Sequence, residues 1–107
     1  MQAITADLFR ALADPTRRAL FEWLAQDGEQ TVHGLTERAG VSQPAVSKHL
    51  AVLKLARLVR DRREGRETHY SVQPRALVPL VDWMSHYGVF WKDRFDRLET
   101  LLNKMEK

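Results

Sequence analysis

Three polar side chains, Gln43, Ser47 and Lys48, have the spacing that places them on one face of a helix expected from Ser42 to about Ala56. A glutamine amide donates and accepts at once, which matches adenine N6 and N7, and serine hydroxyls reach bases or phosphates. A lysine neutralises phosphate as a point charge. The spacing therefore indicates a helix that reads DNA, although the solvated face of an ordinary amphipathic helix fits the same pattern. The residues assigned to DNA contact on this helix are Ser42, Gln43, Pro44, Ser47 and Lys48.

A basic hairpin is predicted directly after this helix. Strands over 58–63 and 67–72 flank Glu64-Gly65, in a short loop of the kind that joins hairpin strands. Arginines gather at its tip, from which they can reach the DNA backbone or the adjacent minor groove. The wing residues predicted to contact DNA are Arg62, Arg63, Arg66 and His69.

The helix before the reading helix completes a helix–turn–helix. Thr31 is expected to cap it and Gly40 to end it, two residues before the next cap at Ser42. Such spacing is typical of a pair of helices whose second member enters the major groove.

Further helices are predicted over about 4–13 and 15–27, and from about Arg75 to the end, where Gly88 allows a bend. The predicted fold is mainly α with a small β-hairpin. It is a winged helix-turn-helix of about five helices plus a two-stranded wing. We expect one domain over 1–107, with dimerisation helices at both ends.

Charge is concentrated in the middle of the chain. Residues 42–75 hold eight Lys or Arg and three Asp or Glu, a net charge of +5 in a chain whose total is +3. A basic centre between near-neutral ends favours a polyanion as partner, and a solvated charged face is the alternative. The partner predicted here is double-stranded DNA.

Composition excludes several classes of chemistry. The chain has no cysteine, which removes disulfides, thiolate nucleophiles and thiolate metal sites. Ser47 and His49 are two apart on a helix and do not face each other, so no nucleophile–base pair is evident. No apolar run is long enough to cross a bilayer, and no signal peptide is evident. We expect a cytoplasmic protein that is not an enzyme and binds no membrane.

The apolar stripe of the last helix exceeds what a small domain can cover, and the first helix adds to it. We therefore predict a homodimer in which both helices pack across a two-fold axis. The aromatic side chains of the last helix could also line a pocket for an unknown small-molecule effector. The interface residues predicted are Ile4, Leu8, Phe9, Met84, Tyr87, Trp91, Phe95 and Leu98.

Three segments together resemble the ArsR/SmtB family of bacterial repressors: LADPTRRALFEWL (12–24), GVSQPAVSKHLAVLKLARLV (40–59) and RREGRETHYSV (62–72). The resemblance spans nearly the whole chain, in the right order. It implies a homodimeric winged helix with its first and last helices in the interface, an inverted-repeat operator and, usually, autorepression. By position, the family's wing tip corresponds to Arg62–Arg66, and its DNA-reading helix is matched by Ser42, Gln43, Pro44, Ser47 and Lys48.

Metal sites known from this family are incomplete here. Thr31 and His33 stand where metal-sensing members carry a cysteine pair, and Arg97 stands where a second histidine would follow Asp82 and His86. The chain therefore resembles a non-metal-sensing member, with no metal site and no cofactor. A metal-responsive repressor of the same family and a winged helix used for protein–protein assembly remain the alternatives.

Two further features have open interpretations. Arg17 and Arg18 begin the second helix, where a cation opposes the helix dipole, so each needs a partner: an acid such as Asp14, or a phosphate. His49 falls on the buried side of the reading helix and is expected to be a core histidine.

Overall fold

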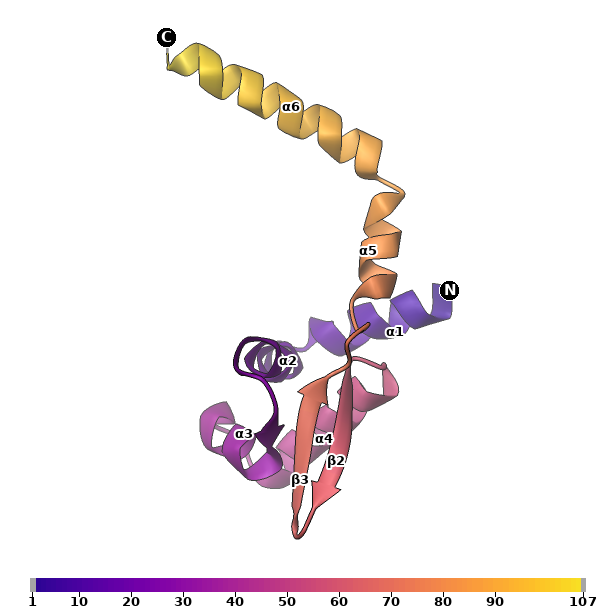
Figure 1. The fold of residues 1–107 in the computed structure, drawn as a ribbon, viewed down its shortest axis with the longest axis vertical. Coiled ribbons are helices and arrows are strands. Elements are labelled where there is room, and N and C mark those ends of the chain that lie inside the picture. Colours follow the sequence, from indigo (N-terminus) through magenta and orange to yellow (C-terminus); the bar gives the residue numbers. More distant parts are fainter. Residues whose placement is uncertain (1, 107) are drawn as a thin grey trace.

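The computed structural model describes residues 2–106, and the side chains of residues 5–106 (Figure 1). Six helices and three short strands follow one another in the described chain. Their order is α1 (Gln2–Ala13), α2 (Pro15–Asp27), β1 (Gln30–Thr31), α3 (Val32–Ala39), α4 (Gln43–Leu55), β2 (Val59–Glu64), β3 (Glu67–Val72), α5 (Val78–Ser85) and α6 (Gly88–Met105).

The start of α2 is tied to the end of α1. Asp14 caps α2 by accepting the Arg17 backbone N–H at 3.0 Å, and this hydrogen bond lowers the pKa of the Asp14 carboxyl. The Arg17 guanidinium donates to the carbonyls of Ala11 and Arg10, and that of Arg18 donates to the carbonyl of Leu12. These carbonyls are the unsatisfied acceptors of the last turn of α1. The guanidinium groups of both arginines therefore have backbone carbonyls of α1 as their hydrogen-bond partners.

Helix α4 ends in a Schellman motif. The Arg57 N–H bonds to the Lys54 carbonyl and the Leu58 N–H to the Leu53 carbonyl, each at 3.0 Å. Leu53 and Leu58 are both fully buried, which supplies the apolar contact that accompanies this motif. Arg57 adopts the left-handed conformation that the motif requires, with φ 63°.

The sheet has three strands in the order β1-β3-β2, all antiparallel. The expected two-stranded wing is therefore extended by β1, which pairs Gln30 with Tyr70 and Thr31 with His69. β2 and β3 pair from Val59–Val72 to Glu64–Glu67, and Gly65 turns between them with φ 62°. The short β1 ties the middle of β3 to the segment that precedes α3.

The core lies between α1, α2, α3 and α4 and the base of the wing. Leu8 belongs to it, with 1% of its surface exposed, so its predicted place in a dimer interface is wrong. Ile4 was also predicted there, but its side chain lies outside the described part. The buried core residues are Leu8, Ala11, Leu20, Phe21, Leu24, Leu35, Val46, Leu50, Leu53, Leu58, Val59 and Ala76.

Two helices replace the single long one predicted from Arg75. α5 begins at Val78 with Pro79 in its first turn, and α6 begins at Gly88, where a bend had been allowed. α6 extends away from the body of the molecule (Figure 1), and none of its described residues is buried. No helix in the described chain has the length and apolar composition needed to cross a membrane.

Candidate nucleic-acid interface

The outward face of α4 carries the polar side chains that the sequence assigns to DNA. Ser42 caps the helix by accepting the Ala45 N–H at 3.3 Å, and Pro44 lies in the first turn, where a missing N–H costs nothing. The inward face consists of fully buried apolar side chains, which fix the rotation of the helix about its axis. The residues left exposed include Ser42, Gln43, Pro44, Ser47 and Lys48, as predicted.

The wing and α4 converge on one cleft of about 210 Å³. Gln43 and Ser47 line it from α4, and Arg66 and Thr68 line it from the wing. The beginning of α3 supplies His33 on the remaining side. Gln43 and Ser47 of α4 thus border the same cleft as Arg66 of the wing, which lies 23 and 19 positions further along the sequence.

Arg63 and Arg66 are the free cations at the wing tip. Both are exposed, and no ion pair or side-chain hydrogen bond involves either guanidinium within residues 5–106. Two unpaired guanidinium groups at the end of a projecting hairpin can take up phosphate oxygens without first leaving another partner.

Arg62, also predicted to contact DNA, differs from these two because it is already paired with carboxylates. Its guanidinium donates to both carboxylate oxygens of Glu29, at 2.5 and 3.3 Å, and to Glu64 at 2.5 Å. These hydrogen bonds raise the pKa of Arg62 and lower the pKa of both carboxyls. A phosphate must therefore displace two carboxylates to bind Arg62.

His69 lies opposite Arg62 in the β2–β3 register and belongs to the same cluster. Its Nδ1 is 3.6 Å from Glu29 and its Nε2 is 3.9 Å from Glu64, with 19% of the side chain exposed. We define Glu29, Arg62, Glu64 and His69 as the wing clamp. This clamp attaches the wing to the loop before β1.

The wing is also attached to α4. Lys54, in the last turn of α4, bonds to Asp61 of β2 at 3.0 Å, and this hydrogen bond raises the pKa of Lys54. Tyr70, on the neighbouring strand, is half-buried, and burial raises the pKa of its hydroxyl. Ion pairs therefore attach the hairpin at two neighbouring positions, Asp61 to α4 and Arg62 to the loop before β1.

Most of the predicted dimer residues are exposed apolar side chains. The exceptions are Leu8, buried in the core, and Ile4, outside the described side chains. Phe9 of α1 is 42% exposed and packs edge-on against Trp83 of α5, with ring centroids 5.2 Å apart. The predicted residues left exposed on α5, α6 and the segment between them are Met84, Tyr87, Trp91, Phe95 and Leu98.

An aromatic cavity of about 680 Å³ lies on this same surface, between α1 and α5. Phe9, Trp83 and Tyr87 line it, with Asp82 and His86 beside them. It is the location that the sequence suggests for an effector pocket, but it belongs to the face that a second chain would cover.

The residues considered for metal binding do not assemble. Among the described residues, no three His, Asp or Glu side chains gather where they could hold an ion. His33 contacts Glu37 at 3.2 Å. The Nδ1 of His86 lies 2.9 Å from the backbone carbonyl of Asp82, so it faces the main chain.

Comparison with known proteins identifies the class of this fold. Residues 14–61 match the family model described as bacterial regulatory protein, arsR family. The transcriptional repressor SdpR of Bacillus subtilis strain 168 is 33% identical over 81 residues, which are 76% of this chain and 89% of SdpR. The chain belongs to the ArsR family. Some other curated ArsR-family relatives are longer, and the chain spans 59–66% of three of them.

Solved structures agree with this assignment. An ArsR-family transcriptional regulator, RHA00566, superposes with a TM-score of 0.77 at 26% identity, covering 86% of this chain and 94% of that one. The homodimeric winged helix-turn-helix DNA-binding domain of Mb0332 from Mycobacterium bovis has a TM-score of 0.67 at 28% identity. That match covers 82% of this chain and 83% of the other. The chain is a winged helix-turn-helix of the ArsR family.

Sequence reasoning missed Glu29 altogether. It follows Gly28, the residue that ends α2, and looks like an ordinary loop acid. Its partner Arg62 is 33 residues away, so no local spacing could have paired the two. An acid in the loop before β1 becomes informative only once β1 is known to pair with β3.

Proposed function

We propose that this protein is a homodimeric transcriptional repressor that binds an inverted-repeat operator in double-stranded DNA. Each protomer places α4 in the major groove and its wing against the adjacent backbone. As a transcriptional regulator it acts in the cytoplasm, and it needs no catalytic group. The whole chain works as one domain, with dimerisation helices at its two ends.

The observation that carries this proposal is the shared cleft between α4 and the wing. Gln43 and Ser47 can address base edges, while Arg66 from the wing lies on the other side of the same cleft. Lys48 and Arg63 add exposed cations on the same two elements. An element for bases next to an element for phosphates is the division of roles that winged helices use on DNA.

Dimerisation is supported by the exposed apolar surface of α5 and α6. Trp91, Phe95 and Leu98 are each about half-exposed or more, on a helix with no buried residue. Contiguous apolar surface of this kind marks an interaction site on a protein. The homodimeric state of the Mycobacterium bovis relative points to a second copy of the same chain as the partner.

Two alternatives make different predictions. A metal-responsive repressor would release DNA when zinc is added, but it would need ligands beyond His33, Asp82 and His86. A winged helix used only for protein assembly would show no salt-dependent DNA binding. The net charge of +5 over residues 42–75 argues against that alternative.

Selection from a random pool of duplexes tests the proposal directly. We expect the selected sites to contain a dyad, with half-sites one helical turn apart or a multiple of it. Sedimentation at micromolar concentration should give a dimer. A monomer, or selected sites without dyad symmetry, would contradict the proposal.

A further inference from the structure

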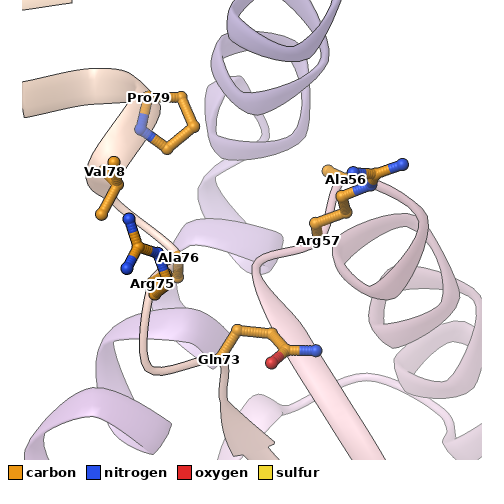
Figure 2. A pocket seen from close by; sticks show the side chains of 7 residues that line it. All are labelled: Ala56, Arg57, Gln73, Arg75, Ala76, Val78 and Pro79. Carbon is orange, nitrogen blue, oxygen red and sulfur yellow. The ribbon is translucent and has the colours of Figure 1, made fainter. Parts of the chain in front are cut away.

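Polar side chains gather beside the wing at two places away from its tip. One is a cavity of about 380 Å³ between the end of α4, the segment after β3 and the start of α5 (Figure 2). There the guanidinium groups of Arg57 and Arg75 point away from each other and from the space between them, so they do not form a common site. The other place is the wing clamp, in which each of the four side chains contacts at least one of the others.

In the wing clamp, Arg62 and His69 face the same two carboxylate oxygens. Arg62 donates to Glu29 Oε1 through Nη2 and to Glu64 Oε2 through Nη1, each at 2.5 Å. His69 has its Nδ1 3.6 Å from that oxygen of Glu29 and its Nε2 3.9 Å from that oxygen of Glu64. The imidazole therefore lies next to both acceptors that hold the guanidinium.

Only a protonated His69 can donate to both carboxylates. A neutral imidazole has one N–H donor and one acceptor nitrogen, whereas an imidazolium has two donors. In either neutral tautomer, one ring nitrogen therefore presents a lone pair to a carboxylate oxygen. Hydrogen bonds from Arg62 lower the pKa of the Glu29 and Glu64 carboxyls, and the charge of His69 lowers it further. Both acids are therefore ionised throughout the range, about pH 5 to 8, in which histidine side chains change charge.

Protonation of His69 also changes the charge of the wing clamp. With a neutral imidazole, the clamp has two carboxylates and one guanidinium, a net charge of −1, and an imidazolium brings this to zero. On the other side of β3, β1 places the uncharged Thr31 opposite His69. Arg60 of β2 acts on Glu29 through its charge, which does not change in this pH range. The charge that varies within the clamp is therefore that of His69.

The helices that pack against β3 direct their charged groups elsewhere. In α3, His33 contacts Glu37 at 3.2 Å, and Arg38 contacts Asp27 of α2 at 2.8 Å. The other charged side chains of α2 are Arg17 and Arg18, which donate to α1, and the exposed Glu22. Within the described chain, the ion pairs of His69 are therefore those of the clamp, with Glu29 and Glu64.

We infer that the wing clamp is a pH-dependent device that controls how available Arg62 is to DNA. An imidazolium at His69 donates to Glu29 and Glu64, so these carboxylates compete less with phosphate for the guanidinium. Half of the Arg62 side chain is exposed, so the guanidinium can turn from the clamp to a phosphate without unfolding the wing. DNA affinity therefore rises as the pH falls and His69 gains its proton; this last statement rests on the proposed function.

NMR on the free protein tests the clamp without DNA. The Nε–H resonance of Arg62 and the ring resonances of His69 are followed from pH 8 to pH 5.5 in an isotope-labelled sample. We expect both to shift with a common midpoint, and we expect His69→Gln to leave the Arg62 resonance unchanged over this range. An Arg62 resonance that does not follow the titration of His69 would overturn the proposal.

The effect on DNA is measured by fluorescence anisotropy at pH 8 and pH 5.5, at constant ionic strength. The wild type should bind roughly three- to tenfold more tightly at pH 5.5, because a dimer has two clamps and each releases one exposed cation. His69→Gln should lose most of this gain. Arg62→Gln removes the cation that is released, so it should also lose most of the gain, and it provides a second test if His69→Gln does not fold.

His86→Gln is the matched control. It replaces an exposed histidine at the end of α5, an element that lies away from the wing tip (Figure 1), and it should keep the full gain in affinity. Equal pH dependence in the wild type and in His69→Gln would overturn the proposal. A gain that is lost in His33→Gln and kept in His69→Gln would also overturn it, since the histidine at the DNA cleft would then be responsible.

The two measurements together separate this proposal from the function on which it rests. Coupled titration of His69 and Arg62 in a protein that binds no DNA would leave the clamp in place and remove the proposed function. DNA binding with independent titrations would overturn the clamp and leave the function. Coupled titration with a DNA affinity that does not depend on pH would overturn the link between the clamp and DNA.

Discussion

The guanidinium of Arg62 and the carboxylate of Glu29 form a two-point ion pair across 33 residues of sequence, with Nη2–Oε1 at 2.5 Å and Nε–Oε2 at 3.3 Å. The pair connects the loop before β1 to the wing. It also places a carboxylate where a DNA phosphate would otherwise bind. Glu29 therefore has two effects on the wing: it holds Arg62 in place and it competes with DNA for it.

Replacing Glu29 should show which effect dominates. In Glu29→Gln the charge that competes with phosphate is lost, so we expect tighter binding to operator and scrambled duplexes alike. The slope of log affinity against log salt should become steeper, by less than about one unit per bound protomer, because Arg62 becomes more available to phosphate while Glu64 remains paired with it. Fluorescence anisotropy titrations over a series of salt concentrations measure both quantities.

Glu22→Gln is the matched control for this experiment. Glu22 is an exposed residue of α2, and its replacement makes the same change in net charge away from the wing clamp. Glu22→Gln should give only the small gain in DNA affinity that comes from the long-range change in net charge. Weaker DNA binding by Glu29→Gln would mean that holding the wing in place matters more than competition with phosphate.

Asp14 should contribute to the acid sensitivity of the fold. The Arg17 N–H lowers the pKa of Asp14 below 3.8 in the folded state, so the unfolded chain binds its proton more readily. Its stabilising contribution is complete above that pH and is lost as the pH falls through the folded-state pKa. Asp14→Asn keeps a capping acceptor but cannot titrate. Urea unfolding from pH 6 to pH 2 should show a shallower loss of stability for this variant, and an identical pH profile would contradict the assignment.

Arg57→Gly should stabilise the protein. The left-handed conformation at φ 63° is unfavourable for a residue with a Cβ, by roughly 1–2 kcal/mol, while glycine adds flexibility to the unfolded chain. The expected net gain is about 0.5–1 kcal/mol in the free energy of unfolding. Arg57→Ala keeps the Cβ and should gain nothing. Chemical denaturation measures both variants, and equal stabilities would show that the backbone there is not strained.

Local signals predicted the elements that present the site. Asp14, Thr31 and Ser42 each cap the helix predicted for them, and Gly28 and Gly40 follow the helices that they end. These signals succeed because a cap and its helix are only a few residues apart. The exposed face of α4 followed from the same helix bounds and the period of 3.6 residues.

Contacts between distant residues were not predictable in this way. β1 has only two residues, and it exists because β3 lies beside it, with the paired residues 40 and 38 positions apart in the sequence. The hydrogen bonds from Arg17 and Arg18 to the carbonyls of α1 depend on the angle between two helices. The wing clamp depends on β1 in turn. Each of these contacts needs the tertiary fold before its residues meet.

Metals should not release this protein from DNA. The family's metal sites need several ligands, and here His33 contacts Glu37 while His86 Nδ1 faces the Asp82 carbonyl. We expect zinc, cadmium and arsenite at micromolar concentration to leave the DNA affinity unchanged. Loss of binding on adding zinc, with recovery on adding a chelator, would support the metal-responsive alternative. His33, Asp82 and His86 would then be the first residues to replace.

Substitutions should distinguish the residues that recognise bases from the residues that bind phosphates. Gln43→Ala removes a side chain proposed to pair with a base edge, so it should cost about 1–3 kcal/mol on the operator and relax the preference at one position in each half-site. Arg66→Ala, Arg63→Ala and Lys48→Ala remove cations proposed to bind phosphate. Each should weaken binding to operator and scrambled duplexes alike, and lower the salt slope by roughly one unit per protomer.

Arg62→Ala provides a contrast within the same wing, because its guanidinium is already paired with Glu29 and Glu64. Its loss should change the salt slope less than the loss of Arg66, since fewer counterions are exchanged for a cation that carboxylates already neutralise. The affinities of these variants on both duplexes, measured across salt concentrations, test the whole assignment. If Gln43→Ala lost affinity equally on both duplexes while Arg66→Ala lost it only on the operator, the roles of helix and wing would be reversed. If no variant changed the affinity, DNA binding by this face would be refuted, and the polar side of α4 would be an ordinary solvated surface.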